Sequence, residues 1–266
     1  MLTEPRRKQE LQAKNGVNNM GSTGSNKSGN SNSIMSFQDG NATVKLDSPL
    51  VYSDTKQSLS NGALKEIMSF ENKHVKSKRE HSILLMNDGK VIETNTGGKG
   101  HVSASTQARM RADILSHNHP NPLEGALGGT FSSADLTNFI TFGQEMYRAS
   151  AKEGTYVITM DTSDPSYTRT KALNFLNDYK QLENQQTKQF KKLQKQWKKE
   201  INQEINNIFA DQSLSYSERM TKAKAADKAF MQKQIKEANR QLIEAHNWLL
   251  QNANKNGFHY GLERRE

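Results

Sequence analysis

The sequence contains no cysteine, only five prolines in 266 residues, and no long apolar run. Without thiols, disulfide bonds and thiolate metal sites are excluded, so a bound metal would need histidine, aspartate or glutamate ligands. No segment reaches the length that spans a membrane, and the N-terminus lacks the apolar core of a secretory signal. We therefore expect a protein without membrane contact, cytoplasmic or associated with a phage or mobile element.

Charge is unevenly distributed along the chain. The net charge is +9, and from Lys171 to Glu266 a total of 18 Lys and Arg oppose 11 Asp and Glu, a difference of +7. A solvated helical surface accounts for this excess, and contact with nucleic acid or another acidic partner is the alternative. Hydrophobic residues make up only 33% of the chain, so a sizeable part of it should lie outside a core.

Four regions of different composition follow one another. A flexible low-complexity tail comes first, because glycine, serine and asparagine dominate residues 21–33 and cannot bury enough apolar surface to become ordered. Apolar spacing then predicts an α/β domain and, after it, an amphipathic helical hairpin. The predicted regions are a tail over 1–44, an α/β domain over 45–168, a basic helical hairpin over 169–256 and a C-terminal tail over 257–266.

The pattern within 45–168 predicts a small mixed β-sheet flanked by helices. A helix that Ser132 or Ser133 can cap is expected to run past Asp135 to about 152, to bury Phe142 and Met146 and to stop at Gly154. The other expected elements are a helix over 59–71, strands over 80–86 and 90–95, a short helix over 103–110, a strand leading to residue 117 and a strand over 155–160.

Two apolar stripes run through the C-terminal third. A break over 211–218 separates them, and Ser215 or Ser217 can cap the second helix. Six lysines and no acidic residue occur from Lys188 to Lys199, which would suit an acidic partner. Phe190 and Trp197 fall on the stripe, however, so packing explains these aromatic residues better than nucleic-acid contact does.

The most informative stretch is His117-Asn118-His119-Pro120, with Ser132 and Asp135 downstream. A mostly apolar strand leads into it, and side chains alternate along a strand, so both imidazoles point to one face and the Asn118 side chain to the other. A carboxylate from the start of the next helix completes a three-ligand set that suits Zn²⁺ and leaves a fourth tetrahedral position for water. A polar histidine pair at an exposed strand end is the alternative.

The order His-x-His-Pro, Ser-x-x-Asp resembles the JAMM motif of the JAB/MPN metalloprotease family, and His-Asn-His-Pro is most similar to the RadC branch of that fold. The resemblance covers roughly residues 45–168. It implies that His117, His119 and Asp135 bind zinc. It also implies that Ser132 helps to hold the oxyanion and that a glutamate from an upstream strand works on the metal-bound water.

That glutamate corresponds to Glu80, at the point where a predicted helix gives way to a strand. Glu66 and Glu71 on the predicted helix are rivals, and a surface charge among basic neighbours is the alternative reading of Glu80. Asp113 shares the strand face of the histidines and is expected to be a structural hydrogen bonder.

Two features depart from the family pattern. Fifteen residues separate His119 from Asp135, more than is usual, so Leu123 to Gly129 is interpreted as an inserted loop, and Asn121-Pro122 replaces the Ser-Gly of RadC proteins. We expect a zinc-dependent peptidase or isopeptidase that acts on a peptide or protein substrate. The alternatives are an inert JAB-type binding or assembly module and a RadC-like nucleic-acid-associated protein.

Overall fold

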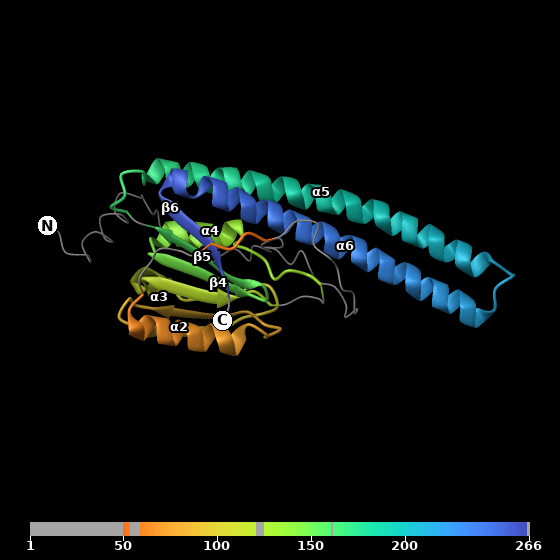
Figure 1. The fold of residues 1–266 in the computed structure, drawn as a ribbon, viewed down its shortest axis with the longest axis horizontal. Helices are drawn as coiled ribbons and strands as arrows, with labels where there is room; N and C mark the ends of the chain where they lie inside the picture. Colours follow the sequence, from red (N-terminus) through yellow and green to blue (C-terminus); the bar gives the residue numbers. More distant parts are fainter. Residues whose placement is uncertain (1–49, 54–58, 121–124, 161, 265–266) are drawn as a thin grey trace, which may run out of the picture.

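The computed structural model describes residues 50–53, 59–120, 125–160 and 162–264. Six strands form one mixed sheet with the order β2-β1-β3-β4-β5-β6. Helices lie on both faces of this sheet, and two long helices extend together well beyond it (Figure 1). The α/β class with a C-terminal helical hairpin is therefore confirmed, whereas the predicted tail over 1–44 lies outside the described residues.

The elements follow the chain in two groups. The first contains α2 (Asn61–His74), β1 (His81–Leu85), β2 (Val91–Thr96), α3 (Thr106–Arg111) and β3 (Ile114–Asn118). The second contains α4 (Ser133–Phe142), β4 (Met146–Ala151), β5 (Gly154–Met160), α5 (Arg169–Ala210), α6 (Tyr216–Asn252) and β6 (Phe258–Glu263). Strands β3 and β4 pair in parallel and are joined by a crossover that contains α4, while the other neighbours pair antiparallel.

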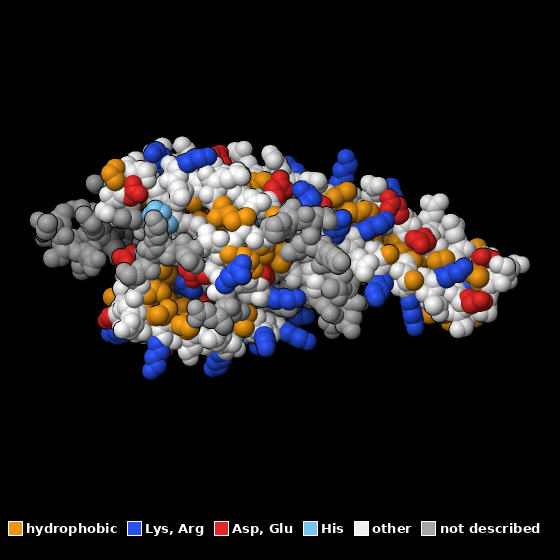
Figure 2. Space-filling view, in the orientation of Figure 1, with side chains coloured by type: hydrophobic (Ala, Val, Ile, Leu, Met, Phe, Trp, Pro, Cys, Tyr) orange, Lys and Arg blue, Asp and Glu red, His pale blue; other side chains and the backbone are white. Residues whose placement is uncertain are grey.

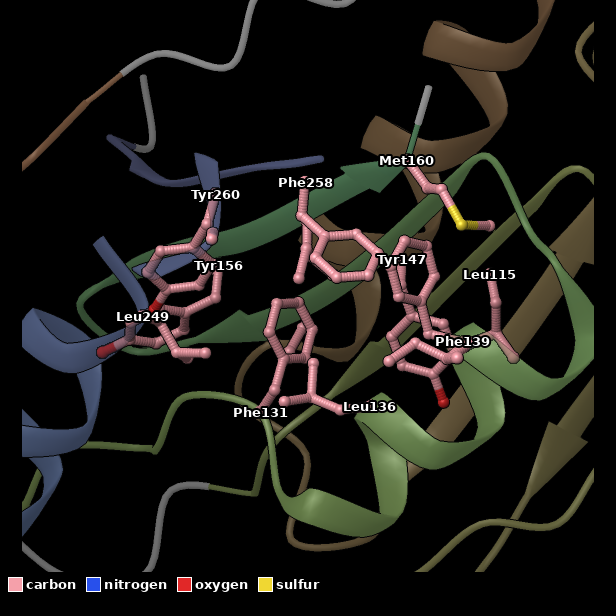
Figure 3. Packing of buried hydrophobic residues seen from close by; sticks show 14 of the residues in the cluster. Leu115, Phe131, Leu136, Phe139, Tyr147, Tyr156, Met160, Leu249, Phe258 and Tyr260 are labelled. Carbon is pink, nitrogen blue, oxygen red and sulfur yellow. The ribbon is translucent and has the colours of Figure 1, made fainter. Parts of the chain in front are cut away.

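The two faces of the sheet carry separate apolar clusters, because side chains alternate along each strand. Ile83 and Ile114 pack beneath α2 on one face. Leu84 and Leu115 belong to the larger cluster on the other face, beneath α4 and the base of the hairpin. Figure 3 shows this larger cluster, in which residues from α4, α6 and the strands interdigitate around Phe131. His117 of β3 shares the face of the larger cluster.

A buried ion pair crosses the face covered by α2. Glu71 is 5% exposed, and its carboxylate accepts hydrogen bonds from Arg148 Nε at 2.7 Å, Ser116 Oγ at 2.9 Å and Thr155 Oγ1 at 3.1 Å. Arg148 also contacts Glu263 of β6 at 3.1 Å. The network ties α2 to β3, β4 and β5, and through the guanidinium to the last strand.

Glu71→Ala is expected to lower the free energy of unfolding by roughly 3–5 kcal/mol, because it removes the main counter-charge of a buried guanidinium. Urea unfolding followed by circular dichroism measures the change. Glu204→Ala removes an exposed glutamate of α5 and is the control, with an expected change below about 0.5 kcal/mol. Equal effects of the two substitutions would contradict the stabilising role of the network.

The helix predicted to run past Asp135 to about 152 has Ser132 as its cap, and the prediction is wrong beyond Phe142. Helix α4 ends there because Gly143 takes the left-handed conformation, with φ of 64°. Residues Met146–Ala151 instead form β4, in which every residue is buried. Methionine, arginine and alanine favour helices, but burial between β3 and β5 outweighs that weak local preference.

The segment over 257–266, which was expected to be a tail, contributes an edge strand. Strand β6 pairs with β5 from Thr155 to Met160, and its Phe258 and Leu262 are fully buried. Residues that follow the hairpin in sequence therefore form one edge of the sheet.

The hairpin consists of helices of 42 and 37 residues, each about 60 Å long at 1.5 Å per residue. Ser215 caps α6 and forms a capping box with Glu218, so the first of the two predicted caps is the one used.

Phe190 is buried and Trp197 is half-buried, as packing predicts, while the six lysines from Lys188 to Lys199 are exposed. Basic and acidic side chains are interspersed along the projecting part (Figure 2). No helix in the described ranges carries an apolar stretch that would cross a bilayer.

Candidate metal centre

Strand β3 and the residue that follows it present two imidazoles toward the larger cluster. His117 is 3% exposed and lies in a strand whose residues are all buried. His119 is the first residue after this strand, and its backbone N–H donates a hydrogen bond to Ser150 O at 2.8 Å. Their Nε2 atoms lie 2.9 Å apart. His119 Nδ1 lies 2.7 Å from the carbonyl oxygen of Gly129. A carbonyl can only accept, so the Nδ1 atom carries the proton and Nε2 presents its lone pair.

The first turn of α4 brings in the carboxylate of Asp135. Ser132 caps this helix, and its backbone N–H and hydroxyl donate to Asp135 Oδ2 at 2.8 and 2.7 Å. The other oxygen, Oδ1, lies 3.7 Å from His117 Nε2, and Oδ2 lies 4.0 Å from His119 Nε2. The capping box therefore fixes the orientation of the Asp135 carboxylate beside the two histidines.

The three side chains fit a zinc ion. One ligand atom from each of His117, His119 and Asp135 lies within 4.8 Å of the others. Ligand atoms around a tetrahedral zinc lie about 3.3 Å apart, since each bond measures about 2.0–2.1 Å, so small side-chain rotations suffice. A cation between the two Nε2 atoms would also accept the lone pair that His119 Nε2 presents. This set would hold the metal by three protein ligands and leave a fourth position open.

The electrostatics of the group favour the protonation state that metal binding needs. Burial lowers the pKa of His117, although Asp135 opposes this. Burial alone would raise the pKa of Asp135, but His117, His119 and the hydrogen bonds from Ser132 hold it below its usual value. At neutral pH the group therefore contains a neutral His117 imidazole and a carboxylate anion, the forms in which these ligands bind metals.

Glu80 reaches the same site from the start of β1. Strands β1 and β3 pair antiparallel with Ser82 opposite His117, and extending that register by two residues places Glu80 opposite His119, on the same face. Burial raises the pKa of Glu80 to about 7, a rise that His119 opposes and Asp135 reinforces. A carboxyl poised near neutrality beside a metal-binding group is suited to proton transfer.

The two rival glutamates lie elsewhere. Both belong to α2, which covers the opposite face of the sheet, and Glu71 is engaged there by Arg148. Asp113 accepts a hydrogen bond from the backbone N–H of Asn87 at 3.0 Å, in keeping with its expected structural role. Of the candidates from the sequence, the structure brings Glu80 and Ser132 together with the three possible ligands.

A cavity of about 340 Å³ opens over the group. Glu80, His117, His119, Ser132 and Asp135 all line it. One further wall comes from the loop over 99–104, and another from the base of the hairpin, including Tyr179, Gln186, Gln241 and Leu242. The hairpin is thus part of the site's surroundings and not a separate appendage.

The loop over 125–129, which leads toward α4, is anchored from two sides. Glu153 accepts hydrogen bonds from the backbone N–H groups of Gly128 and Gly129. Asn239 of α6 is 2% exposed, accepts from Leu127 N at 2.9 Å and donates to Gly125 O at 2.8 Å. The same loop supplies the Gly129 carbonyl that orients His119, so α6 acts through this loop on one of the three possible ligands.

Asn239→Ala is expected to weaken zinc binding about 10-fold, the lower end of what lost support of a metal ligand costs. The loop would lose the two hydrogen bonds that connect it to α6. Competitive titration of zinc against a chromophoric chelator measures the affinity. Asn206→Ala, at an exposed position of α5, is the control and should bind zinc as the wild type does. Unchanged zinc affinity in Asn239→Ala would show that the loop does not need this anchor.

Comparisons with protein-family models, with curated proteins and with solved structures find no match to this chain.

Two residues of the site were not found by sequence reasoning. Asn239 lies about 120 positions after His119, in a helix whose pattern indicates only packing, and no sequence signal connects the two. For Asn118, strand alternation predicts only that the side chain points away from the histidines. Its position between the two histidines is a usable signal. The amide side chain must point to the opposite face of the sheet, and there it needs hydrogen-bond partners.

Proposed function

We propose that the protein is a zinc-dependent hydrolase of peptide or isopeptide bonds. The observation that carries the proposal is the convergence of His117, His119 and Asp135 with the half-buried Glu80 in one cavity. Two imidazoles and one carboxylate are a donor set that zinc accepts with an open position. The resemblance to the JAMM motif supports the same assignment.

When bound, zinc would supply Lewis acidity and lower the pKa of a water molecule to about 7. Glu80 would take the proton from the attacking water and pass it to the nitrogen that leaves as the C–N bond breaks. The raised pKa of Glu80 suits both tasks, because the group can accept and return a proton near neutral pH.

Ser132 has a defined position in this proposal. Its hydroxyl donates to Asp135 Oδ2 at 2.7 Å and accepts from Asp135 N at 3.1 Å, so it orients the proposed ligand. To stabilise an oxyanion as the resemblance implies, the hydroxyl would have to turn from Asp135 toward the cavity that it lines.

The proposal is tested with purified protein that has been loaded with zinc and then freed of excess metal. We expect one zinc per chain by mass spectrometry and cleavage of members of a quenched fluorogenic peptide library. His117→Ala should lose both the zinc and the cleavage, because it removes a buried ligand.

His259→Ala is the matched control, because this histidine is exposed on β6. It should keep wild-type zinc content and cleavage. Zinc that remains stoichiometric in His117→Ala would contradict the site, and a zinc-loaded protein that cleaves no peptide or isopeptide-linked substrate would contradict the reaction.

A further inference from the structure

Asn118 lies between the two histidines, and its side chain is buried on the opposite face of the sheet with no exposed surface. Its Oδ1 atom accepts a hydrogen bond from His81 N at 2.7 Å, and its Nδ2 atom donates to Arg79 O at 3.0 Å. These two backbone groups belong to the immediate neighbours of Glu80. The amide therefore holds the chain on both sides of the proposed proton-transfer residue.

The orientation of this amide is fixed by its partners. A backbone N–H can only donate and a backbone carbonyl can only accept, so the Oδ1 and Nδ2 atoms cannot exchange places. Aspartate in the same position would keep the acceptor for His81 and lose the donor for Arg79. Alanine would lose both hydrogen bonds.

The other side of the same short segment is held by the loop that follows β2. Glu80 N donates to Gly98 O at 2.7 Å, and Gly97 N donates to Glu80 O at 2.7 Å. Backbone pairing between β1 and β3 begins only at Ser82, opposite His117. Ahead of that pair, the Asn118 side chain supplies the hydrogen bonds that connect the segment to β3.

We propose that Asn118 is a positioning residue that holds the Glu80 carboxylate over the metal-binding group. The inference rests on the proposed function and assigns a task to each member of the His-Asn-His stretch. The imidazoles of His117 and His119 hold the metal on one face, and the amide between them fixes the base from the other. A displacement of about 1 Å at a reacting group can cost about 10²-fold in rate, so loosening this segment should be visible in catalysis.

The first test compares Asn118→Ala with the wild type, using zinc-loaded protein and a fluorogenic peptide selected from the library. We expect kcat to fall about 100-fold, with KM and zinc affinity within about threefold of the wild-type values. Asn95→Ala, at a half-buried position of the neighbouring strand β2, is the control and should keep the wild-type kcat. Loss of zinc affinity equal to the loss of kcat would overturn the inference, because Asn118 would then act on the ligands.

A double-mutant cycle separates positioning from a general structural effect. In the Glu80→Gln background, Asn118→Ala should lower the residual rate less than about threefold, because the carboxylate that Asn118 positions is already absent. The same 100-fold loss in both backgrounds would overturn the inference while leaving the proposed function intact. A wild-type protein without zinc or without cleavage would instead refute the proposed function.

Amide hydrogen exchange gives a readout that needs neither zinc nor substrate. The His81 amide should exchange at least about 10-fold faster in Asn118→Ala than in the wild type, because its acceptor is removed. If Asn118→Ala does not fold, Asn118→Asp is used instead. This variant should keep the hydrogen bond from His81 N, lose the hydrogen bond to Arg79 O and show a lowered kcat. Unchanged kcat in a folded Asn118→Asp, or unchanged His81 exchange in a folded Asn118→Ala, would overturn the proposed positioning.

Discussion

Glu80→Gln is expected to lower kcat about 10²- to 10⁴-fold while zinc content stays at the wild-type level. Glutamine fills the space of glutamate but cannot accept the proton of the attacking water. Peptide cleavage by zinc-loaded protein and metal analysis of the same preparation measure the two quantities. Glu66→Gln on α2, at the far face of the sheet, is the control and should retain wild-type kcat. A fully active Glu80→Gln would remove this residue from the reaction.

The same substitution should make the metal-free protein more stable. The pKa of Glu80 is raised from 4.5 to about 7, so ionisation of this carboxyl destabilises the fold increasingly as pH rises through that window. In chelator at pH 8, Glu80→Gln is expected to raise the free energy of unfolding by about 1–3 kcal/mol. At pH 4 the difference should be small, because Glu80 is then protonated in both the folded and unfolded states. Urea unfolding at the two pH values measures it.

Zinc is expected to raise the melting temperature by about 8–16 °C, the second large effect. A ligand present at about 1,000 times its dissociation constant stabilises the folded state by about 4 kcal/mol. For a chain of this size each kcal/mol corresponds to about 2–4 °C. Differential scanning calorimetry with zinc and with chelator gives the increment directly.

His119→Ala should abolish most of that increment, because two ligands then remain on a site built for three. His259→Ala should melt with the full zinc-dependent increment. An increment that is equal in both variants would place the stabilising zinc elsewhere on the protein. An increment that is absent from the wild type as well would contradict zinc binding by the folded chain.

Part of this site could be predicted from local sequence. The alternation of a strand places His117 and His119 on one face, and the Ser-x-x-Asp spacing is that of a helix cap, so the three possible ligands follow from short-range rules. The placement of Glu80 could not be derived in this way. It depends on the register between β1 and β3, which are separated by β2 and α3 in sequence.

The incorrect helix beyond Phe142 has a different cause. The residues of β4 have no strong strand preference, and they form a strand because the sheet leaves a buried position between β3 and β5. The role of Asn239 also could not be predicted from local sequence. It depends on the tertiary contact between α6 and the loop over 125–129. Local rules predict the three possible ligands, whereas tertiary contacts decide which residues surround and orient them.

The return of the chain through the hairpin has a consequence for folding. Met160 and Phe258 are paired neighbours in the sheet but lie about 100 positions apart in sequence. Closing an unstructured loop of that length costs on the order of 4 kcal/mol in chain entropy. Residues of α5 and α6 on either side of the turn at Asp211 are close in sequence, so the two helices can pair from that turn first. Their pairing then brings Met160 and Phe258 together. Docking of β6 is then a late step that waits for the hairpin, and a nascent chain would complete its sheet only after its final strand has been synthesised.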